Sequence, residues 1–498
     1  MSVRFPSRNL GDTIAKVAVG SAAAFVDEGT GIALSLGEIE GRAARFGGAM
    51  AERFAVGDRV GLLGTNGADF IIAYLGLMRA GLVPVPINYR LPAATIAHIL
   101  SDSACRLVLG DAEFSSSVPE GTRFVAFGSA THRRYLEAEP GAVVRPEPGD
   151  LCEILYTSGS TGLPKGVPLD HAGQVWALEV FLGTLTDEPE RTIIAAPTYH
   201  MNGLFFTTVA LAAGWRTLSM PRFDARAYLE IAARERVTMV SGIPTMLAMM
   251  ARETDLLARL DLSSVRNVII GSAPLTNALI ERTKAIFPNA SVRNSYGTTE
   301  SGPAMFGPHP KGLARPPLSI GYPYPGTEWK LLDGSPEEGR LLTRTPAVLK
   351  EYLNLPQVTA NKLSDGWYDT GDIVRRDADG WFYFVGRADD MFVCGGENVY
   401  PGEVEKLLER HPAVLQAAVI AVPDEIKGMV PVAFVVPVGG ETLDPGALKA
   451  FTLEHGPAYA HPRRIAVLDG LPVGGTHKVD RKALEKLAET MAGDLARR

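Results

Sequence analysis

The sequence predicts an α/β fold, with a large N-terminal domain of helix-covered parallel sheets, a small β-rich subdomain and a small α/β C-terminal domain. In the first three-quarters of the chain, apolar runs of strand length alternate with helical patterns, as in Arg59–Leu63, Ala68–Ala80 and Leu82–Pro86. That alternation is typical of parallel sheets covered by helices. From Gly321 to Phe384 the pattern changes to short strands joined by tight turns, which indicates a β-rich unit.

The predicted domain boundary falls at Gly386–Asp390. A chain of 498 residues is too long for one ordinary core. We expect an N-terminal domain over 1–386, with the β-rich subdomain at 321–386, and a C-terminal domain over 387–498. The segment Ala304–Pro317 is rich in Gly and Pro and predicts a loop. The C-terminal domain is expected to contain a helix after Pro401, strands at 417–422 and 432–436, a helix at 447–453, a strand at 465–468 and a last helix from Asp480.

Composition and charge exclude several classes of protein. The hydrophobic content is 46% and the charged content 21%, as expected for a soluble globular protein. The net charge is 49 − 56 = −7, so no basic field is available for nucleic acid or anionic lipid. Three widely spaced cysteines lack metal-ligand spacing and are expected as buried thiols in a reducing compartment. The apolar run Val17–Val26 is shorter than the ~20 residues that span a bilayer. We therefore interpret it as a helix end leading into a first strand, and expect a cytoplasmic protein.

The most informative stretch is Tyr156-Thr-Ser-Gly-Ser-Thr-Gly-Leu-Pro-Lys-Gly166. Its small residues allow successive backbone N–H groups to converge on an anion, while four hydroxyls and Lys165 supply further donors. No Gly-Lys-Ser/Thr triplet closes it, so it is not a Walker loop. A flexible surface turn would require neither the lysine nor the hydroxyl series. The stretch therefore predicts a phosphate-binding loop after a strand.

Three further strand-like runs end in loops of small and polar residues. Thr192–Ala196 leads into Pro197-Thr-Tyr-His-Met-Asn-Gly203, Asn267–Ile270 into Gly271-Ser-Ala-Pro-Leu275, and Ser291–Arg293 into Asn294-Ser-Tyr-Gly-Thr-Thr-Glu300. Ligands of open α/β sheets bind beyond the carboxyl ends of the strands. We expect the loops to line one cleft.

The heptad Asn294–Glu300 carries groups suited to a nucleotide. Tyr296 offers a flat face to a base, and Thr299 offers a hydroxyl to a phosphate. Gly297 allows a close approach of the ligand. Glu300 can hold Mg²⁺, which binds phosphates through one or two protein carboxylates. In Tyr368-Asp-Thr-Gly-Asp372, the carboxylate of Asp372 can accept both ribose hydroxyls.

Together these motifs resemble the adenylate-forming superfamily, in particular its acyl- and aryl-CoA synthetase branch, over nearly the whole chain. The resemblance implies adenine and Mg²⁺ roles for Tyr296, Thr299 and Glu300, and a ribose role for Asp372 with Arg387. The run Gly386–Glu405 is similar to the hinge of the family, with Asp389 as the hinge residue and a mobile C-terminal domain after it. The resemblance also implies that Gly395 and Gly396 lie beside the incoming thiol arm.

Lys478 lies in Pro472-Val-Gly-Gly-Thr-His-Lys-Val-Asp-Arg481. This segment resembles the one whose lysine bridges the acid and the α-phosphate. His477 stands where the family usually has Gly, and Gly474 and Gly475 restore conformational freedom. His200, after Pro197-Thr-Tyr, is interpreted as a positioning and gating group at the mouth of the acyl pocket, and not as a base.

These inferences give a set of candidate residues. The catalytic candidates are Lys478, Lys165, Thr299, Glu300 and His200. The candidates for binding nucleotide or CoA are Thr157, Ser158, Gly159, Ser160, Thr161, Gly162, Lys165, Gly271, Ser272, Ala273, Asn294, Tyr296, Gly297, Thr298, Thr299, Asp372, Arg387, Lys478, Gly395 and Gly396. The acyl pocket is expected to contain His200, Met201, Phe205, Ile243, Gly271, Gly297 and Met305. The metal candidates are Glu300 and Thr161.

The predicted function is that of an AMP-forming acid–CoA ligase using ATP, Mg²⁺ and coenzyme A. The apolar residues near the loops indicate an apolar monocarboxylate, with an aromatic acid as the first choice and a medium-chain or branched acid as the second. Two alternatives stay open: a free-standing enzyme that loads the phosphopantetheine of a carrier protein, and a non-catalytic nucleotide-binding protein on the same scaffold. No nucleic-acid partner is expected, and the oligomeric state, monomer or homodimer, is left open.

Overall fold

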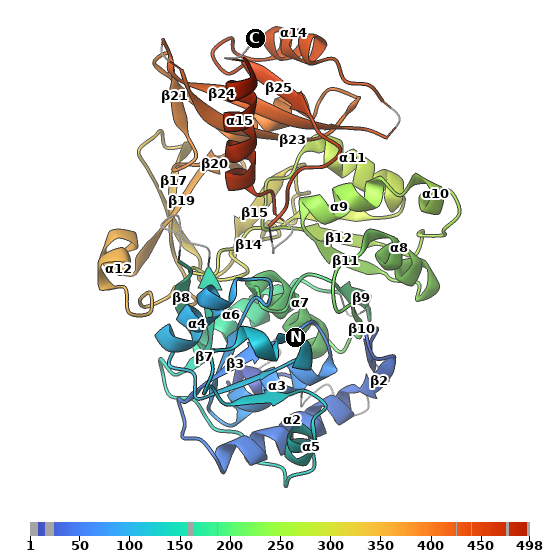
Figure 1. The fold of residues 1–498 in the computed structure, drawn as a ribbon, viewed down its shortest axis with the longest axis vertical. Coiled ribbons are helices and arrows are strands. Elements are labelled where there is room, and N and C mark those ends of the chain that lie inside the picture. The colour runs from blue at the N-terminus through green and yellow to red at the C-terminus, as the bar shows by residue number, and fades with distance from the viewer. Residues whose placement is uncertain are drawn as a thin grey trace.

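The protein consists of a large lobe and a smaller cap that lies over it (Figure 1). The computed structural model describes residues 8–14, 24–157, 163–186, 188–424, 426–439, 441–474 and 478–495. We call residues 8–387 the large lobe and residues 392–495 the cap. In the described part of the chain, no helix combines the length and the apolar character that crossing a bilayer requires.

A four-stranded parallel sheet forms the base of the large lobe, in the order β4-β3-β5-β6. Its strands are β3 (Arg59–Leu63), β4 (Val83–Pro86), β5 (Leu107–Gly110) and β6 (Phe124–Ala126). The neighbouring helical elements are η1 (Leu10–Asp12), α2 (Leu36–Ala51), α3 (Ala68–Arg79), α4 (Ala93–Asp102), η2 (Ala112–Ser117) and α5 (Ala130–Leu136). Helix α2 begins with a capping box in which Ser35 and Glu38 satisfy each other's backbone N–H groups. The strands and the helix predicted over residues 59–86 are confirmed.

A seven-stranded sheet forms the second layer, in the order β13-β12-β11-β9-β10-β1-β2. All neighbours pair in parallel except the edge pair β1–β2. The strands are β1 (Ala24–Asp27), β2 (Ile32–Ser35), β9 (Arg191–Ile194), β10 (Arg216–Ser219), β11 (Met239–Gly242), β12 (Asn267–Ile270) and β13 (Ser291–Asn294). The helices are α6 (His171–Leu182), α7 (Met201–Ala212), α8 (Ala225–Arg234), α9 (Pro244–Ala251), α10 (Thr254–Leu257) and α11 (Asn277–Ile286). Buried aliphatic side chains of β9, β11 and β12 pack against those of α8, α9 and α11 to form one core.

The strand before the predicted phosphate loop lies outside both parallel sheets. Strand β7 (Leu151–Thr157) pairs antiparallel with β8 (Lys165–Asp170), and Thr157 is in register with Lys165. The loop follows a strand, as predicted. It connects the strands of a hairpin, because the residues after it form a second strand that buries Val167 and Leu169. Residues 158–162 of the loop lie outside the described part of the chain.

A third, antiparallel sheet has the order β14-β15-β20-β19-β17-β16, with β18 paired to β19. Its strands are β14 (Phe306–Gly307), β15 (Ser319–Pro323), β16 (Glu328–Leu332), β17 (Glu338–Arg344), β18 (Leu363–Ser364), β19 (Trp367–Arg376) and β20 (Phe382–Arg387), and helix α12 covers Pro356–Lys362. The sheet starts earlier than the predicted residue 321, inside the segment predicted as a loop. Phe306 explains the difference, since it is buried with its ring centroid 5.1 Å from that of Phe382.

The cap contains the predicted α/β pattern. Its sheet has the order β22-β21-β24-β23, with β25 paired in parallel to β24. The strands are β21 (Phe392–Cys394), β22 (Glu397–Val399), β23 (Val414–Asp424), β24 (Gly428–Pro437) and β25 (Arg464–Val467), and the helices are α13 (Pro401–Leu408), α14 (Pro445–His455) and α15 (Arg481–Leu495). The chain leaves the third sheet at Arg387 and enters the cap sheet at Phe392, so Asp389 lies between the two parts.

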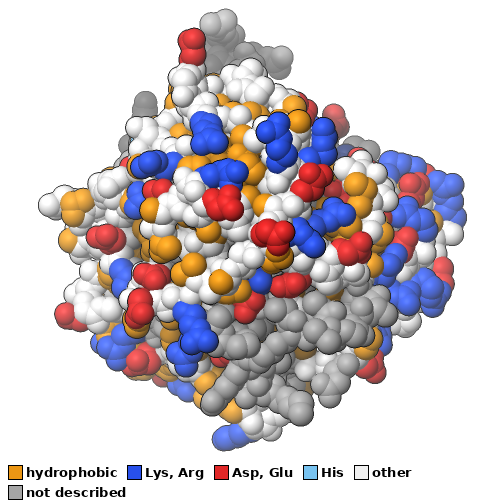
Figure 2. All heavy atoms as spheres, turned by 90° about the horizontal axis from the view of Figure 1, so that it is seen from below, with side chains coloured by type: hydrophobic (Ala, Val, Ile, Leu, Met, Phe, Trp, Pro, Cys, Tyr) orange, Lys and Arg blue, Asp and Glu red, His pale blue; other side chains and the backbone are white. Residues whose placement is uncertain are grey.

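The face of the large lobe away from the cap has mixed character. Figure 2 shows acidic and basic side chains interspersed there, with hydrophobic side chains between them.

Candidate active site

A cleft of about 800 Å³ lies between the strand ends of the large lobe and the cap. Its walls include the loops after β9, β11, β12 and β13, the third sheet, and the start of α13 and β23 in the cap. The predicted meeting of the loops is thus found, although one of them belongs to the β7–β8 hairpin and not to the seven-stranded sheet.

Most predicted site residues line this one cleft. They are Thr157, Lys165, His200, Met201, Phe205, Ile243, Gly271, Ser272, Ala273, Asn294, Tyr296, Gly297, Thr298, Thr299, Glu300, Asp372, Arg387, Asp389 and Lys478. Ser158, Gly159, Ser160, Thr161 and Gly162 lie outside the described residues, as do Gly475 and His477.

Three predicted residues lie elsewhere. Met305 is fully buried in a hydrophobic cluster with Tyr296 and Phe306, behind the cleft wall, so it belongs to the core and not to the acyl pocket. Gly395 and Gly396 form the exposed turn between β21 and β22, both with positive φ, and do not line the cleft. In this orientation of the cap, Lys478 lines the cleft and the two glycines do not.

The Asp372 carboxylate is the centre of a buried network on β19. The Tyr296 hydroxyl donates to its Oδ2, and Arg387 Nη1 donates to its Oδ1 at 3.0 Å. Arg387 also donates through Nε and Nη2 to the carboxylate of Asp389, each at 2.9 Å. Burial raises the pKa of Asp372, and Arg387 and Tyr296 oppose that rise. Because the carboxylate is fixed on both oxygens, it is held in one orientation at the cleft wall.

The Glu300 carboxylate is positioned by a tyrosine pair that the sequence did not reveal. Tyr352 donates to Glu300 Oε1 at 3.1 Å and lies 3.0 Å from the Tyr368 hydroxyl. Lys165 Nζ lies 5.4 Å from the centre of the Tyr352 ring. The backbone carbonyl of Glu300 accepts from Leu349 N at 2.7 Å. One carboxylate, one ammonium and two phenols thus meet where the β7–β8 hairpin reaches the third sheet.

Gly297 is required for the geometry of the Asn294–Glu300 loop. A Cβ atom at this position would lie 2.4 Å from the backbone oxygen of Pro303, which is closer than real Cβ contacts allow. The loop also closes on itself through a pair of backbone hydrogen bonds between Thr298 and Gly302. These contacts fold the loop tightly and keep Tyr296 and Glu300 on the cleft side.

Lys478 lines the cleft from the cap and lies three residues before the start of α15. Burial lowers the pKa of its ammonium, whereas the carboxylates of Asp372 and Glu300 raise it and Arg387 lowers it. The same ammonium therefore interacts with residues of the third sheet and of the loop after β13. Its positive charge therefore lies within electrostatic reach of the Asp372 and Glu300 carboxylates.

The part of the cleft next to α7 and α9 is mainly apolar. It is lined by Met201, Phe205, Phe206, Ile243 and Met246. Asn202 is a polar exception, donating from Nδ2 to Ser272 Oγ at 3.1 Å. None of the described lysines and arginines that line the cleft belongs to α7, to α9 or to the loops before these helices. They are Lys165, Lys362, Arg387, Lys406, Lys478 and Arg481.

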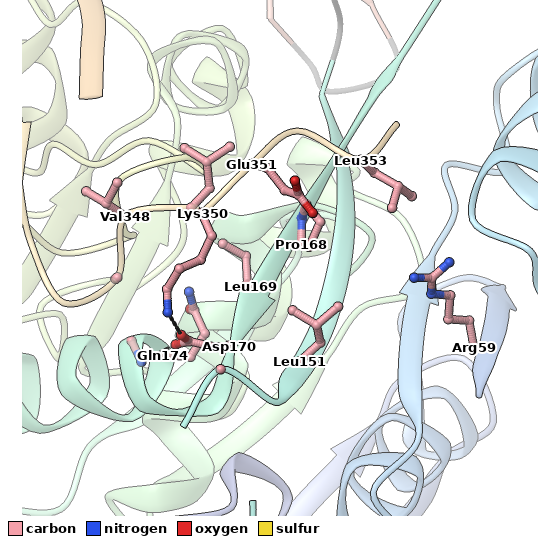
Figure 3. Close-up of a pocket in the computed structure, with 14 residues that line it drawn as sticks. Arg59, Leu151, Pro168, Leu169, Asp170, Gln174, Val348, Lys350, Glu351 and Leu353 are labelled. Atoms are coloured by element: carbon pink, nitrogen blue, oxygen red, sulfur yellow. Dashed lines mark hydrogen bonds and ion pairs between the residues drawn. The ribbon is translucent and has the colours of Figure 1, made fainter. Parts of the chain in front are cut away.

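A second cavity, of about 190 Å³, borders the β7–β8 hairpin and the segment 347–353 (Figure 3). Lys350 Nζ contacts Asp170 Oδ2 there at 2.9 Å, and Arg59 of β3 lies on the other side. No predicted site residue lines it. The candidate active site is therefore the large cleft alone.

Comparison with known proteins agrees with this site. The family model described as AMP-binding enzyme matches residues 14–353, more than half of the chain, and the model for the C-terminal domain of these enzymes matches residues 403–478. The chain belongs to the AMP-binding enzyme family. The match to both parts confirms the resemblance seen in the motifs, and as a member of this family the protein is an enzyme.

Relatives and solved structures extend over nearly the full chain. A feruloyl-CoA synthase of Amycolatopsis sp is 34% identical over 465 residues, covering 90% of this chain and 93% of the relative. A fatty acid–[acyl-carrier-protein] ligase of Streptomyces coeruleorubidus is 33% identical and covers 90% and 89%. The crystal structure of an anthranilate CoA ligase in complex with anthranoyl-AMP has a TM-score of 0.88 at 26% identity, covering 97% and 98%.

Proposed function

We propose that this AMP-binding enzyme is an acid–CoA ligase that activates an apolar carboxylic acid with ATP. The observation that carries the proposal is the convergence of Lys478, Glu300, Asp372 and Lys165 on one cleft beside an apolar pocket. The relatives that are named CoA ligases support the same activity. A protein that only bound nucleotide would not need these four groups around one cleft.

In the first step, a carboxylate oxygen of the acid attacks the α-phosphorus of ATP. The bond from that phosphorus to the bridging oxygen breaks, and pyrophosphate leaves with its electron pair. A carboxylate needs no general base at neutral pH, so the enzyme has to position the reactants and offset negative charge. We propose that Asp372 binds the ribose and that Tyr296 contacts the adenine base. Lys478 and Lys165 would offset the negative charge that develops on the reacting phosphates.

The donor set fits a magnesium ion. Mg²⁺ is usually held by one or two protein carboxylates together with substrate phosphates and water. The Glu300 carboxylate lines the cleft and is oriented by Tyr352, while Thr298 and Thr299 add hydroxyls nearby. In the described part of the chain, no cluster of three or more His, Cys, Asp and Glu forms a cage of its own. When bound, the ion would neutralise phosphate charge, with Glu300 as its protein ligand.

In the second step, a thiol sulfur attacks the acyl carbon of the adenylate, the bond from that carbon to the phosphate oxygen breaks, AMP leaves with the electron pair, and the thiol proton passes to solvent. Gly395 and Gly396 lie outside the cleft while Lys478 lies inside it. We propose that the cap rotates about Asp389 between the steps and exchanges one face for the other. Water has to be excluded in the interval, because the mixed anhydride hydrolyses readily.

The acid is proposed to be an apolar monocarboxylate, aromatic in the first instance. The acyl end of the cleft is built from Met, Phe and Ile side chains, and no lysine or arginine from those segments lines it. The names of two similar proteins, a feruloyl-CoA synthase and an anthranilate CoA ligase, support an aromatic acid. A fatty acid is the second candidate, supported by the carrier-protein ligase.

The test is a screen for pyrophosphate release over aryl and alkyl acids, with CoA or a phosphopantetheinylated carrier protein as acceptor. We expect acid-dependent pyrophosphate release, with thioester formed on CoA. Thioester on the carrier protein and none on CoA would favour the carrier-loading function instead. If none of the aryl or alkyl acids supported pyrophosphate release, the proposal would be contradicted.

A further inference from the structure

Helix α11 of the large lobe and its N-cap residue each contact the cap through one side chain. The Thr276 hydroxyl donates to Glu409 Oε2 at 2.7 Å. Arg282 donates through Nη1 to the backbone oxygen of Leu415 at 2.7 Å, and through Nη2 to that of Val414. In Figure 1, α11 lies directly beneath β23, in agreement with these hydrogen bonds.

Both contacts are partly shielded from water. Burial lowers the pKa of Arg282, while the Glu409 carboxylate opposes this. Glu409 accepts from Ala417 N at 3.0 Å through its other oxygen, so its carboxyl bridges α11 and β23. A charged donor on two carbonyls is stronger than a neutral one and is costly to leave without acceptors once buried. The contact is therefore directional and not a chance surface approach.

The same helix and strand of the cap also hold the segment that carries Lys478. Arg481, three residues after Lys478, donates to Glu405 Oε1 at 2.9 Å and to Val419 O at 2.6 Å. Glu405 and Glu409 are four residues apart at the C-terminal end of α13, so they share one face. A continuous set of hydrogen bonds thus joins α11, through α13 and β23, to the base of Lys478.

Within the described part of the chain, a hydrogen bond between α13 and the third sheet also crosses between the lobes. Lys406 Nζ donates to Phe384 O at 3.1 Å, and these residues flank Asp389 in the sequence. A rotation about Asp389 displaces distant points more than near ones. The cap partners of Thr276 and Arg282 lie 20 to 26 residues beyond Asp389 in the sequence, and we expect a rotation of the cap to separate them from α11.

We propose that Arg282 and Thr276 are positioning residues for adenylation, which rests on the proposed two-step reaction. They hold the cap in the orientation that places Lys478 in the nucleotide cleft, and they release β23 when the cap turns for thiol attack. Neither side chain acts on the reacting atoms. Their loss should therefore affect the first half-reaction and leave the second intact.

The experiment compares Arg282→Ala, Arg282→Lys and Thr276→Val with wild type in both half-reactions. Adenylation is followed by acid-dependent exchange of pyrophosphate into ATP, and thiol transfer by single-turnover thioester formation from supplied acyl-adenylate and CoA. We expect adenylation in Arg282→Ala to fall by about 10- to 100-fold, the size that loss of charge-assisted hydrogen bonds implies. Thiol transfer should stay within about 2-fold. Arg282→Lys should recover part of the adenylation rate, since an ammonium can still donate to one carbonyl.

The matched control is Arg226→Ala. Arg226 lies on α8 and forms ion pairs with Glu253 and Asp255, all within the large lobe. Its removal also deletes an arginine with two acceptors, but it leaves the cap contact unchanged. We expect both half-reactions to be within about 2-fold of wild type in this variant, on the scale of exposed ion pairs.

A readout independent of activity separates this proposal from the proposed function. Hydrogen–deuterium exchange of a peptide covering Val414–Ala418 should be faster in Arg282→Ala than in wild type or Arg226→Ala. Three results for Arg282→Ala would each overturn the positioning role: an unchanged rate of deuterium exchange, an unchanged rate of adenylation, or an equal loss of both half-reactions. If the wild-type protein showed no pyrophosphate exchange with any acid, the proposed function would fail. The deuterium exchange result would still show whether Arg282 holds β23 against the large lobe.

Discussion

Replacement of Asp372 by Asn is the substitution whose effect the site defines best. The side chain is 6% exposed, and Tyr296 and Arg387 hold its carboxylate. An amide keeps the shape and still accepts from Tyr296, but it removes the charge and one acceptor oxygen. Arg387 keeps its two hydrogen bonds to Asp389, so the fold should persist.

The expected effect is on ATP binding. A hydrogen bond to a charged group contributes about 1.5–3 kcal/mol, and the two ribose hydroxyls would lose one such bond and weaken the other. A total loss of about 3 kcal/mol raises the KM for ATP by about 100-fold, at roughly 1.4 kcal/mol per tenfold. Since the ribose does not change in the reaction, kcat should change much less than KM.

Steady-state kinetics, with the concentrations of ATP and acid varied in turn, measure kcat and the KM for each substrate. The control is Asp377→Asn, which changes a turn aspartate between β19 and β20 that accepts from Trp381 N and the Tyr383 hydroxyl. An unchanged KM for ATP in Asp372→Asn, or a rise in the KM for the acid alone, would refute the assignment of the ribose to this carboxylate.

Three other outcomes follow from the site. Lys478→Ala should reduce adenylation by at least about 100-fold, as loss of a charged group acting on the transition state does, and leave thioester formation from supplied acyl-adenylate largely intact; equal losses would contradict its role. Glu300→Gln should raise the Mg²⁺ concentration needed for half-maximal activity, and chelation should abolish wild-type activity reversibly; an unchanged Mg²⁺ requirement would remove Glu300 as ligand. Burial raises the pKa of Glu409 to about 7, so its protonated form favours the folded state and stability should fall as pH rises from about 4.5 to 7. Glu409→Gln should flatten the pH dependence of Tm in that window, while Glu153, whose pKa is also raised by burial to about 7, still titrates; an unchanged slope would contradict this assignment.

Much of the site could be predicted because its chemistry is local in sequence. Each loop after β9, β12 and β13 carries its own functional groups, and parallel strands bring their carboxyl ends to one edge. The residues of such a loop reach the cleft wherever the sheet places it. This is why the sequence alone could predict that Tyr296, Gly297 and Glu300 lie together at the cleft.

The features that sequence did not predict depend on contacts between distant segments. Tyr352 lies 52 residues from Glu300, and no local pattern marks a tyrosine as the partner of a particular carboxylate. The β7–β8 pairing can be predicted only if Lys165–Asp170 is recognised as a strand. The apolar residues at alternate positions, Val167 and Leu169, are a sequence signal for that strand. The position of Met305 beside the loop predicts a place in the acyl pocket, whereas the direction of its side chain depends on the third sheet. The contact of Arg282 with β23 depends on how the cap sits on the large lobe.

The central claim is that ATP lies across the cleft between the large lobe and the cap, within reach of Lys478. A crystal structure with a non-hydrolysable ATP analogue and an aromatic acid tests it most directly. The account predicts the adenine beside Tyr296, the ribose hydroxyls on Asp372, the phosphates between Thr157 and Glu300, and the acid carboxylate near Lys478. A nucleotide bound at the smaller cavity beside Asp170 and Lys350, or elsewhere away from Asp372, would contradict it.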